Sequence, residues 1–204
     1  MYHSSMVHVT ILLEGKHEKV SHGLYASSTV SLLRAGDANI LVDTGSFGDR
    51  ERLIHSLAKE GLTPLDISKV IVTHLHLDHT ANLDLFKNAD IITKPSPQSA
   101  GLVFHGSNNI VSRLTIDHLE IAPGIHTILT PGHVESHISV VAETNDGTYI
   151  ICGDAIQTAD QVDRAVKPKT AWNMDAFEAS RNVILETADY VVPGHGGVVR
   201  IKGA

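Results

Sequence analysis

Apolar and polar residues alternate in short runs along the first part of the chain. Three such runs predict β-strands, namely "VHVTILLEG" at 7–15, "STVSLLRAG" at 28–36 and "ANILVDTG" at 38–45. The Gly and Asp residues that follow each run are typical of turns. The spacing then changes in "DRERLIHSLAKEG", where Leu53, Ile54, Leu57 and Ala58 recur at helical intervals. This pattern predicts a helix over 49–61 that ends at Gly61.

The next segments predict alternating strands and helices. Strands are expected over 68–73 ("SKVIVT") and 89–93 ("ADIIT"), with a helix over 80–86 ("TANLDLF") between them. Residues 94–114 are rich in Ser, Gly, Asn and Pro and are expected to be irregular. Strands resume over 114–122, 125–130, 137–144 and 148–154, and "NDG" at 145–147 predicts a hairpin between the last two.

The final segments complete a mixed α/β pattern. Residues 155–173 are expected to be irregular, and a helix is expected over 174–188. Its apolar stripe is Met174, Phe177, Ile184 and Leu185, with Arg181 flanking the stripe. The chain then closes with "DYVVPGHGG" at 189–197. Strands in both halves with helices between them predict a mixed α/β fold.

Composition limits the number of domains and the classes of partner. At 204 residues the chain is expected to form a single domain over 1–204. Aromatic residues make up only 4%, so aliphatic side chains must fill the core. Lys and Arg number 16 against 23 Asp and Glu, a formal net charge of -7. This balance argues against sequence-independent binding to nucleic acid or to anionic membranes, which need a basic face.

The chain has features of a cytoplasmic protein. Its single cysteine, Cys152, cannot form an internal disulfide, which fits a reducing compartment. The start "MYHSSMVHVT" does not resemble a signal peptide, and no apolar run approaches the length of a membrane span. We therefore expect a cytoplasmic location and no membrane partner.

The stretch "THLHLDHTANL" at 73–83 concentrates metal-ligating side chains. His74, His76, Asp78 and His79 occupy four of six consecutive positions directly after a predicted strand. A helix would place His74 and His76 on nearly opposite faces, whereas an extended or turning segment places them on one side. We therefore expect a strand that ends at Thr73, a ligand-bearing loop over 74–79, and a helix after it.

Three further candidates follow apolar runs and lie beside glycines. They are His133 in "TPGHVESH", Asp154 at the end of the strand in "IICGDA", and His195 in "VVPGHGG". A lone histidine in such a turn is more often a surface residue than a ligand, and Asp154 alone would more often be a turn or cap residue. Together with the cluster at 74–79, however, they predict a metal site where strand ends converge.

The number of candidate ligands suggests two ions. His74, His76 and His133 would hold one ion and leave a position open for water. Asp78, His79 and His195 would hold a second ion, and Asp154 would bridge both. This donor set suits Zn²⁺, Mn²⁺ or Fe. Two ions ~3.5–4 Å apart would bring the pKa of a shared water toward ~7.

These residues resemble the signature of the metallo-β-lactamase superfamily, HxHxDH followed by a separate His, Asp and His. The resemblance covers roughly residues 25–197 and implies an αββα sandwich, with two facing β-sheets, helices outside and metals at one edge. It also implies that Asp43 in "LVDTG" supports the ligand loop by hydrogen bonding; the alternative is a plain turn at a strand end. Within the superfamily, the segments around residues 40–62, 67–86 and 191–196 are most similar to the metallo-β-lactamase domain-containing protein 1 type.

The resemblance has limits within particular branches. Glyoxalase II carries a helical substrate domain after its last metal histidine, whereas nine residues follow His195 here. Quorum-sensing lactonases have a tyrosine shortly after the bridging aspartate, where this chain has "GDAIQT" with Gln157. Similar proteins often carry a second histidine at the position of His137, which is expected to support the ligands or to face solvent. Cys152 lies two residues before Asp154 and is expected on the same strand face, either as a ligand or, more in keeping with its type, as a core residue.

Two connecting segments are expected to border the metal edge and to influence substrate choice. They carry His105, Asn108 and Asn109 in 94–114, and Gln157, Lys167, Lys169 and Trp172 in 155–173. For each of these residues taken alone, a solvated connector is the simpler interpretation. His17 and six other histidines carry no functional prediction.

The predicted function is a metal-dependent hydrolase. A hydroxide bound to two divalent metal ions, most simply zinc, would attack an ester-like bond in a thioester, lactone or phosphodiester. Asp78 would orient this nucleophile as a ligand and hydrogen-bond acceptor, and the partner would be a small-molecule substrate. One alternative is an oxidoreductase resembling persulfide dioxygenases, with a single iron held by His74, His133 and Asp154. Another is a non-catalytic metal-binding protein. Similar proteins are often dimers, so a homodimer is an option.

Overall fold

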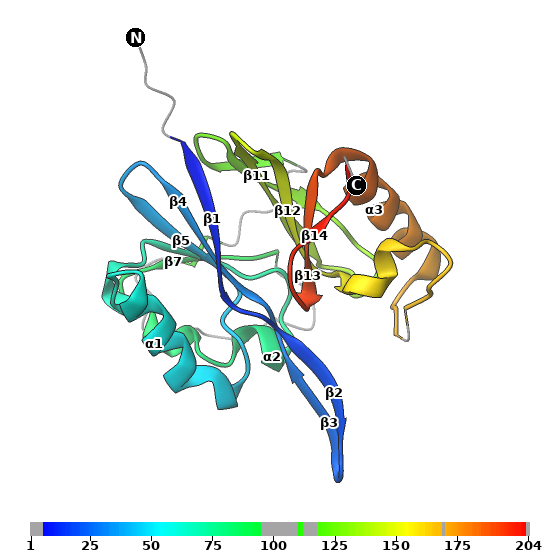
Figure 1. Ribbon diagram of the computed structural model, residues 1–204, viewed down its shortest axis with the longest axis horizontal. Coiled ribbons are helices and arrows are strands. Elements are labelled where there is room, and N and C mark those ends of the chain that lie inside the picture. The colour runs from blue at the N-terminus through cyan, green and yellow to red at the C-terminus, as the bar shows by residue number, and fades with distance from the viewer. Residues whose placement is uncertain (1–5, 95–109, 112–117, 169, 203–204) are drawn as a thin grey trace.

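Two six-stranded β-sheets face each other, with helices on their outer sides, in the computed structural model of the chain (Figure 1). The structure describes residues 6–94, 110–111, 118–168 and 170–202. The first sheet has the order β1 (Val7–Leu13), β4 (Val30–Ala35), β5 (Ala38–Val42), β6 (Lys69–Ile71), β7 (Asp90–Ile92) and β8 (Ile110–Val111). The second has the order β14 (Val199–Arg200), β13 (Tyr190–His195), β12 (Gly147–Thr158), β11 (Ile138–Thr144), β10 (Ile125–Leu129) and β9 (His118–Ala122). The αββα sandwich is thus confirmed.

Side-chain alternation explains how the layers form. On β6 and the residue after it, Val70 and Val72 pack outward against α1 (Arg50–Lys59), while Ile71 points inward to the second sheet. Successive residues of a strand face opposite sides, so a run that is apolar at every position is buried on both. Helix α3 (Met174–Thr187) covers the outer face of the second sheet in the same way, through Ile184 and Leu185.

Parallel pairing brings several strand ends to one edge. Strands β5, β6 and β7 are parallel, and so are β12 and β13. Carboxyl ends of parallel strands lie at the same edge of a sheet, where α/β proteins usually place their functional residues. Asp43 follows β5, His74 follows β6, and His195 ends β13. The "NDG" hairpin between β11 and β12 is confirmed by the pairing of Thr144 with Gly147.

Two helical predictions need correction. The helix expected over 80–86 is instead α2 (Leu77–Thr80) followed by a 3-10 turn, Leu83–Leu85. Asn82 interrupts the helix because its side-chain amide donates to the carbonyls of Thr44 and Ser46, each at 2.8 Å. On α3, Arg181 does not flank the buried stripe but is fully buried, and Met174 is exposed.

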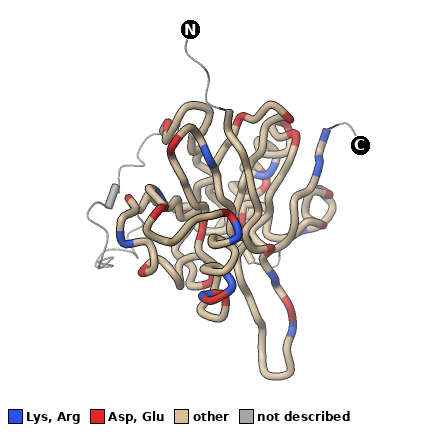
Figure 2. Tube along the Cα trace, turned by 60° about the vertical axis from the view of Figure 1, so that its left-hand side comes forward, with Lys and Arg blue, Asp and Glu red and all other residues tan. Residues whose placement is uncertain are grey.

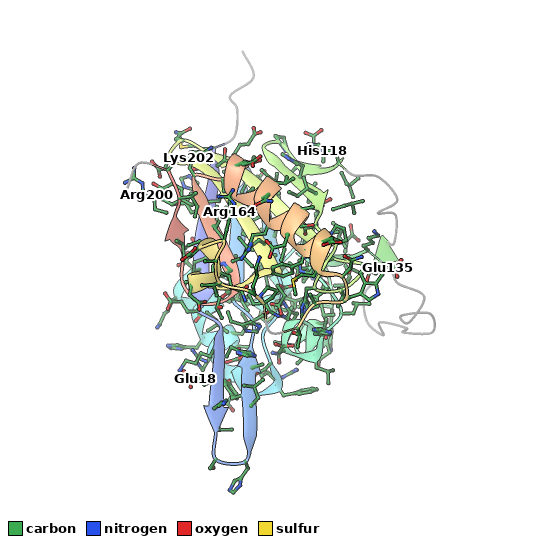
Figure 3. All side chains as sticks on the ribbon, turned by 90° about the vertical axis from the view of Figure 1, so that its right-hand side faces the viewer. Glu18, His118, Glu135, Arg164, Arg200 and Lys202 are labelled. Carbon is green, nitrogen blue, oxygen red and sulfur yellow. The ribbon has the colours of Figure 1, made fainter. Side chains whose placement is uncertain are left out.

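The β2–β3 hairpin, Lys16–Val20 and Gly23–Ser27, was not predicted. It projects from the body near α2 (Figure 1), and every residue of β2 is exposed, so the sequence shows no alternation there. Figure 3 places Glu18 on this hairpin, at the opposite end of the molecule from His118 and Lys202. Acidic and basic residues are interspersed along the described chain, including this hairpin (Figure 2).

The connecting segments are partly more ordered than expected. Strand β12 continues to Thr158 and a 3-10 helix follows it, Ala159–Val162, so the irregular segment 155–173 begins later. The short strand β8 lies inside the segment 94–114, which was expected to be irregular. Most of this segment is outside the described residues. Residues 112–117, where the strand expected over 114–122 begins, are also outside them. Other 3-10 helices are Phe47–Asp49 and Pro64–Asp66. Within the described segments, no helix combines the length and apolar composition that crossing a bilayer requires.

Candidate metal centre

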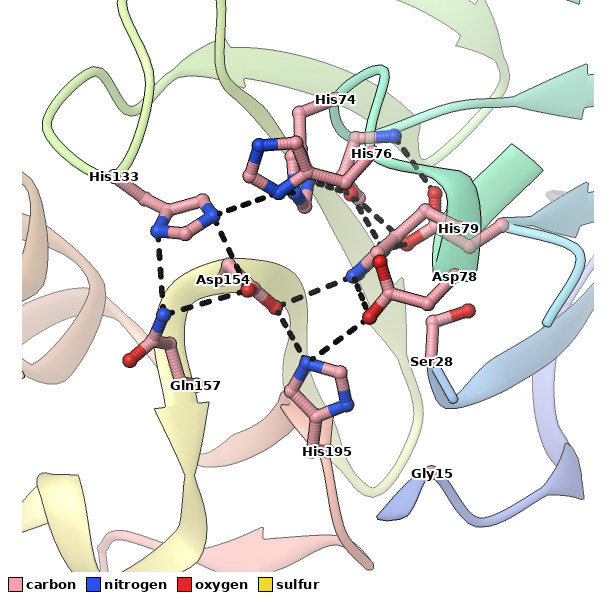
Figure 4. A network of polar contacts seen from close by, with 12 residues as sticks. Gly15, Ser28, His74, His76, Asp78, His79, His133, Asp154, Gln157 and His195 are labelled. Atoms are coloured by element: carbon pink, nitrogen blue, oxygen red, sulfur yellow. Dashed lines mark hydrogen bonds and ion pairs between the residues drawn. The ribbon is translucent and has the colours of Figure 1, made fainter. Parts of the chain in front are cut away.

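The segment after β6 carries four of the candidate ligands in a small space. His74 lies in the extended chain after the strand, and His76 is the residue that precedes α2. Asp78 and His79 belong to the first turn of this helix. The loop expected over 74–79 is therefore half helical, and the short helix turns Asp78 and His79 toward the same centre that His74 and His76 reach from the extended segment (Figure 4).

The second sheet supplies the other three candidates. His133 lies in the turn after β10, and His195 is the last residue of β13. Asp154 was expected at a strand end but lies inside β12, where the pairing register with β13 shifts. The bulge is at Gly153, whose φ of +46° is a left-handed conformation that glycine adopts without strain. An irregularity in the strand, not its end, turns Asp154 into the site.

The donor atoms form two groups, each within 4.8 Å. The first group contains His74, His76, His133 and Asp154, and the second contains Asp78, His79 and His195. In the first, Nδ1 of His76 lies 2.9 Å from Nε2 of His74 and 3.1 Å from Nε2 of His133. Nitrogen ligands of a tetrahedral zinc ion would be roughly 3.4 Å apart, given Zn–N distances of about 2.1 Å. The spacing of the rings therefore fits a common ion.

Asp154 lies between the two groups. Its Oδ2 is 3.3 Å from Nε2 of His133, and its Oδ1 is 3.3 Å from Nε2 of both His79 and His195. Burial alone would raise the pKa of this carboxyl, but the charge of His79 and the polar contacts with the rings of His195 and His79 hold it well below its usual value. Each oxygen of an ionised carboxylate thus faces one group of ligands.

Hydrogen bonds on the far side of the rings aim their free nitrogens inward. Nδ1 of His79 lies 2.8 Å from Oδ2 of Asp43, and Nδ1 of His195 lies 2.9 Å from the carbonyl of Ser27. An imidazole that donates through Nδ1 keeps a lone pair on Nε2. Among the described residues, the buried Nε2 of His79 and Oδ1 of Asp154 have no hydrogen-bond partner. A ring whose outer nitrogen donates to a carboxylate or a carbonyl, while its inner nitrogen has no hydrogen-bond partner, is typical of a metal-binding histidine.

The ring pKa values divide the histidines into two classes. Burial lowers the pKa of His74, His76 and His133, so these rings are neutral at pH 7. Burial also disfavours charge on His79 and His195, but the carboxylates beside them raise the pKa of both. Without an ion, the protonated forms of His79 and His195 are thus favoured, and a metal competes with protons for these two rings.

One side of the cluster is open to solvent. His76 is exposed, and the side chain of Asp78 is 22% exposed. The ring of His17, on the β2–β3 hairpin, lies 5.4 Å from that of His195 between centroids. A hollow of about 400 Å³ lies along this hairpin, lined by His17, Lys19, Val20, Gly23 and Leu24. The unpredicted hairpin thus borders the centre, and His17, which carried no prediction, lies beside a candidate ligand.

The remaining predicted residues have clear positions. Nδ1 of His137 lies 2.9 Å from the hydroxyl of Thr130, and its buried ring packs 5.1 Å from that of His74. Cys152 does not share the face of Asp154, because the bulge at Gly153 reverses the alternation and leaves the thiol in the core under α3. His105, Asn108, Asn109 and Lys169 lie outside the described residues.

The segment after Asp154 reaches the centre at some positions only. The backbone of Trp172 donates to the carbonyl of His133, and Gln157 contacts His133 and Asp154. Lys167 instead forms an exposed ion pair with Glu178 at 2.8 Å. Sequence reasoning assigned no role to Thr73 and Ser27, which contact the outer nitrogens of His74 and His195. The position of Thr73 directly before the ligand segment 74–79 could have suggested its role. Nothing in the sequence could have suggested that of Ser27, which acts through its backbone carbonyl.

Sequence comparisons assign the chain to a known family. The model of the family described as "Metallo-beta-lactamase superfamily" matches residues 25–195. Metallo-beta-lactamase domain-containing protein 1 of Xenopus laevis is 35% identical over 196 residues, 95% of this chain and 81% of that protein. The match to the human protein with the same name covers 63% of the length of that protein. An N-acyl homoserine lactonase of Bacillus thuringiensis is 27% identical over 128 residues, 58% of this chain and 50% of that protein.

A solved structure shares the fold. A Thermotoga maritima protein assigned to the metallo-beta-lactamases superposes with a TM-score of 0.79 at 22% identity, covering 96% of this chain and 99% of the other. At this level of identity the similarity supports the αββα arrangement and does not extend to activity.

Proposed function

The chain belongs to the metallo-beta-lactamase superfamily, and on this premise we propose that it is a hydrolase with two zinc ions that cleaves an ester-like bond in a small molecule. The observation that carries the proposal is the position of Asp154, whose two carboxylate oxygens face two separate groups of ligand atoms. The superfamily and the His/Asp cluster support metal-dependent hydrolysis. The number and identity of the ions and the class of substrate are what we propose beyond that.

The donor set fits two ions of intermediate softness. His74, His76 and His133 would hold one ion with Oδ2 of Asp154, while Asp78, His79 and His195 would hold the other with Oδ1. Five imidazoles and two carboxylates suit zinc, although manganese and iron accept the same donors. Two such ions, when bound, lower the pKa of a water and polarise the substrate's oxygen.

The chain's own residues position the reacting groups. Oδ2 of Asp78 lies 3.7 Å from Nε2 of His195, and its partly exposed carboxylate can accept a proton from a water at the open side of the cluster. Asp43 and the Ser27 carbonyl keep His79 and His195 in the ring orientation that leaves their lone pairs inward. The short helix α2 holds Asp78 beside His79, so the proton acceptor and the ligands move as one unit.

We propose a class of cleaved bond and not a particular substrate. Carboxylic esters, thioesters and phosphodiesters share an electrophilic centre with an oxygen that a metal can polarise and a leaving oxygen or sulfur. The similarity to an N-acyl homoserine lactonase supports testing lactones first. Because that similarity covers 58% of this chain, thioesters and phosphodiesters belong in the same test.

Elemental analysis of protein purified without added metal tests the proposal. We expect about two zinc ions per chain, and turnover of at least one member of a panel of lactones, thioesters and activated phosphodiesters. Turnover should vanish after chelation and return with zinc. A single iron with oxygen uptake on a glutathione persulfide would contradict the proposal and favour the oxidoreductase. Metal-replete protein that turns over no member of the panel, with His76→Ala altering stability only, would favour a non-catalytic role.

A further inference from the structure

Gln157 lies against the metal-binding cluster without belonging to its ligands (Figure 4). Its Nε2 is 3.2 Å from Nδ1 of His133 and donates to Oδ2 of Asp154 at 3.5 Å. A third contact joins the same nitrogen to the hydroxyl of Thr170 at 3.5 Å. One carboxamide therefore touches both the shared carboxylate and a ring of the first ligand group.

The backbone determines which end of this carboxamide faces the cluster. The amide N–H of Gln157 donates to Oε1 of Gln161 at 2.8 Å. A backbone N–H can only donate, so the oxygen of Gln161 must face it, and Nε2 of Gln161 is left to face Oε1 of Gln157 at 3.5 Å. The nitrogen of Gln157, with its two donor hydrogens, then points toward Asp154 and His133.

A residue of helix α3, Arg181, holds Gln161 in place, and Gln161 in turn orients Gln157. Gln161 is 4% exposed, and its carbonyl accepts a hydrogen bond from Arg181 at 3.2 Å. The guanidinium of Arg181 is itself fully buried and also donates to the carbonyls of Arg164 at 2.9 Å and Val166 at 2.7 Å. A continuous set of contacts thus runs from the core under α3 through Gln161 to Gln157.

We propose that Gln157 is a positioning residue that orients the carboxylate of Asp154 for metal. Its contact with Nδ1 of His133 requires the ring proton on Nε2, so that contact belongs to the metal-free protein and does not support the ligand form of the ring. The N–H group directed at Oδ2 of Asp154 limits rotation of the carboxylate that both ligand groups share. Partners that orient a ligand in this way typically change metal affinity 10–100-fold when they are removed. This inference rests on the proposed metal centre.

The test compares metal binding by variants of similar side-chain size. Gln157→Met keeps the length of the side chain and removes its N–H groups, and Gln161→Met removes the acceptor that aims Gln157. Lys167→Met is a matched control, because it breaks an exposed ion pair on the same segment without touching the cluster. Co²⁺ serves as the probe, with its affinity measured by chelator competition and its site geometry followed by visible absorption. Thermal unfolding of the metal-free variants checks folding.

We expect Gln157→Met to bind one Co²⁺ about 10–100-fold more weakly, with a changed absorption spectrum. Gln161→Met should shift affinity in the same direction, and the double variant should lose no more than Gln157→Met alone, because both act through one contact. Lys167→Met should bind like the parent protein.

Unchanged Co²⁺ affinity in Gln157→Met would overturn the role of Gln157 and leave the proposed function standing. Losses of affinity that add up in the double variant would have the same meaning. Parent protein that takes up no metal overturns the proposed function as well. If the buried Gln161 cannot be replaced without unfolding the protein, the Co²⁺ affinity of Gln157→Met still tests the role of Gln157.

Discussion

The carboxylate of Asp43 lies 2.8 Å from Nδ1 of His79, on the side of the ring that faces away from the ligand cluster. The same carboxylate accepts the backbone N–H and the hydroxyl of Thr73, at 2.8 and 2.9 Å. Asp43 has a φ of +59°, the only such value outside glycine among the described residues. Aspartate and asparagine tolerate this left-handed conformation better than other residues, so the position combines a rare backbone with a directing carboxylate.

Asp43→Asn should weaken metal binding about 10–100-fold while the fold is retained. Asparagine suits the backbone, and its oxygen can still accept from the N–H of Thr73, but its NH₂ group then faces Nδ1 of His79. That arrangement favours a proton on Nε2 of His79, where the lone pair is needed. Chelator competition measures the affinity. Asp66→Asn, which alters an exposed cap at Thr63, is the control and should bind like the parent protein. Equal affinity in both variants would refute this role of Asp43.

Loss of single ligands should remove one ion at a time, except at Asp154. His195→Ala removes a donor from the second group only, and His133→Ala removes one from the first. We expect each variant to retain about one ion per chain. Asp154→Ala removes the carboxylate that both groups share and should leave fewer ions than either. Elemental analysis after gel filtration measures the content. Two ions retained in all three variants would contradict the assignment of the groups.

The pattern of residues predicted a mixed α/β fold and the members of the cluster, and the resemblance to a known family implied the layers. Prediction failed where tertiary contacts override local patterns. The continuous apolar runs in "SKVIVT" and "ANILVDTG" were sufficient to predict two strands, because both faces of each strand are covered in the fold. Asn82 ended a helix early through hydrogen bonds to a segment 36 to 38 residues away, which no local pattern records. The exposed hairpin carried no hydrophobic alternation at all.

The candidate ligands meet in space, whereas their metal content stays a prediction. Residue type and spacing were enough to single out His74, His76, Asp78 and His79, because four strong ligands rarely gather for packing reasons. Ser27 could not be found, because its contribution is a backbone carbonyl that any residue offers. Cys152 was placed on the wrong face because strand alternation fails across the bulge at Gly153.

Gly194→Ala should displace Asp154 and weaken metal binding by at least about tenfold. A Cβ at this position would lie 2.1 Å from Oδ1 of Asp154 and 3.0 Å from the carbonyl carbon of Gly153, so either the carboxylate or the bulge must move. Gly197→Ala is the matched control, since its Cβ would meet only the end of the exposed Glu14 side chain at 3.0 Å. Metal affinity and circular dichroism of both variants decide the matter. The proposed crowding at Asp154 is wrong if the two alanines have the same effect.

Cys152→Ala should leave the metal content unchanged and lower the free energy of unfolding by about 1 kcal/mol, the scale of a small core truncation. The thiol is buried under α3, where its Sγ lies 3.1 Å from the carbonyl of Val192, and burial raises its pKa. Elemental analysis and urea denaturation provide the two measurements. In the native protein the thiol should also react with a disulfide reagent far more slowly than after unfolding. A drop in bound metal in Cys152→Ala would instead make the thiol a ligand.

His137 should make the metal-free protein sensitive to acid. Burial lowers the pKa of this ring to about 3, from an ordinary value near 6.5 in the unfolded chain. Above pH 6.5 the ring is neutral in both states. As the pH falls from 6.5 toward 3, the unfolded chain takes up a proton that the folded protein refuses, so stability decreases. Over the two pH units down to 4.5 the loss from this ring amounts to about 3 kcal/mol, at 1.36 kcal/mol per unit.

His137→Gln isolates this contribution, because glutamine stays neutral and can still bond the hydroxyl of Thr130. The variant is expected to be less stable than the parent near pH 7.5, since the ring's packing against His74 is lost. Between pH 7.5 and 4.5, however, its free energy of unfolding should fall by about 3 kcal/mol less than that of the parent. Urea denaturation with a chelator present measures both proteins at both pH values. Parallel pH profiles would mean that His137 takes up its proton in the folded state, with the ring or its surroundings rearranged to admit water.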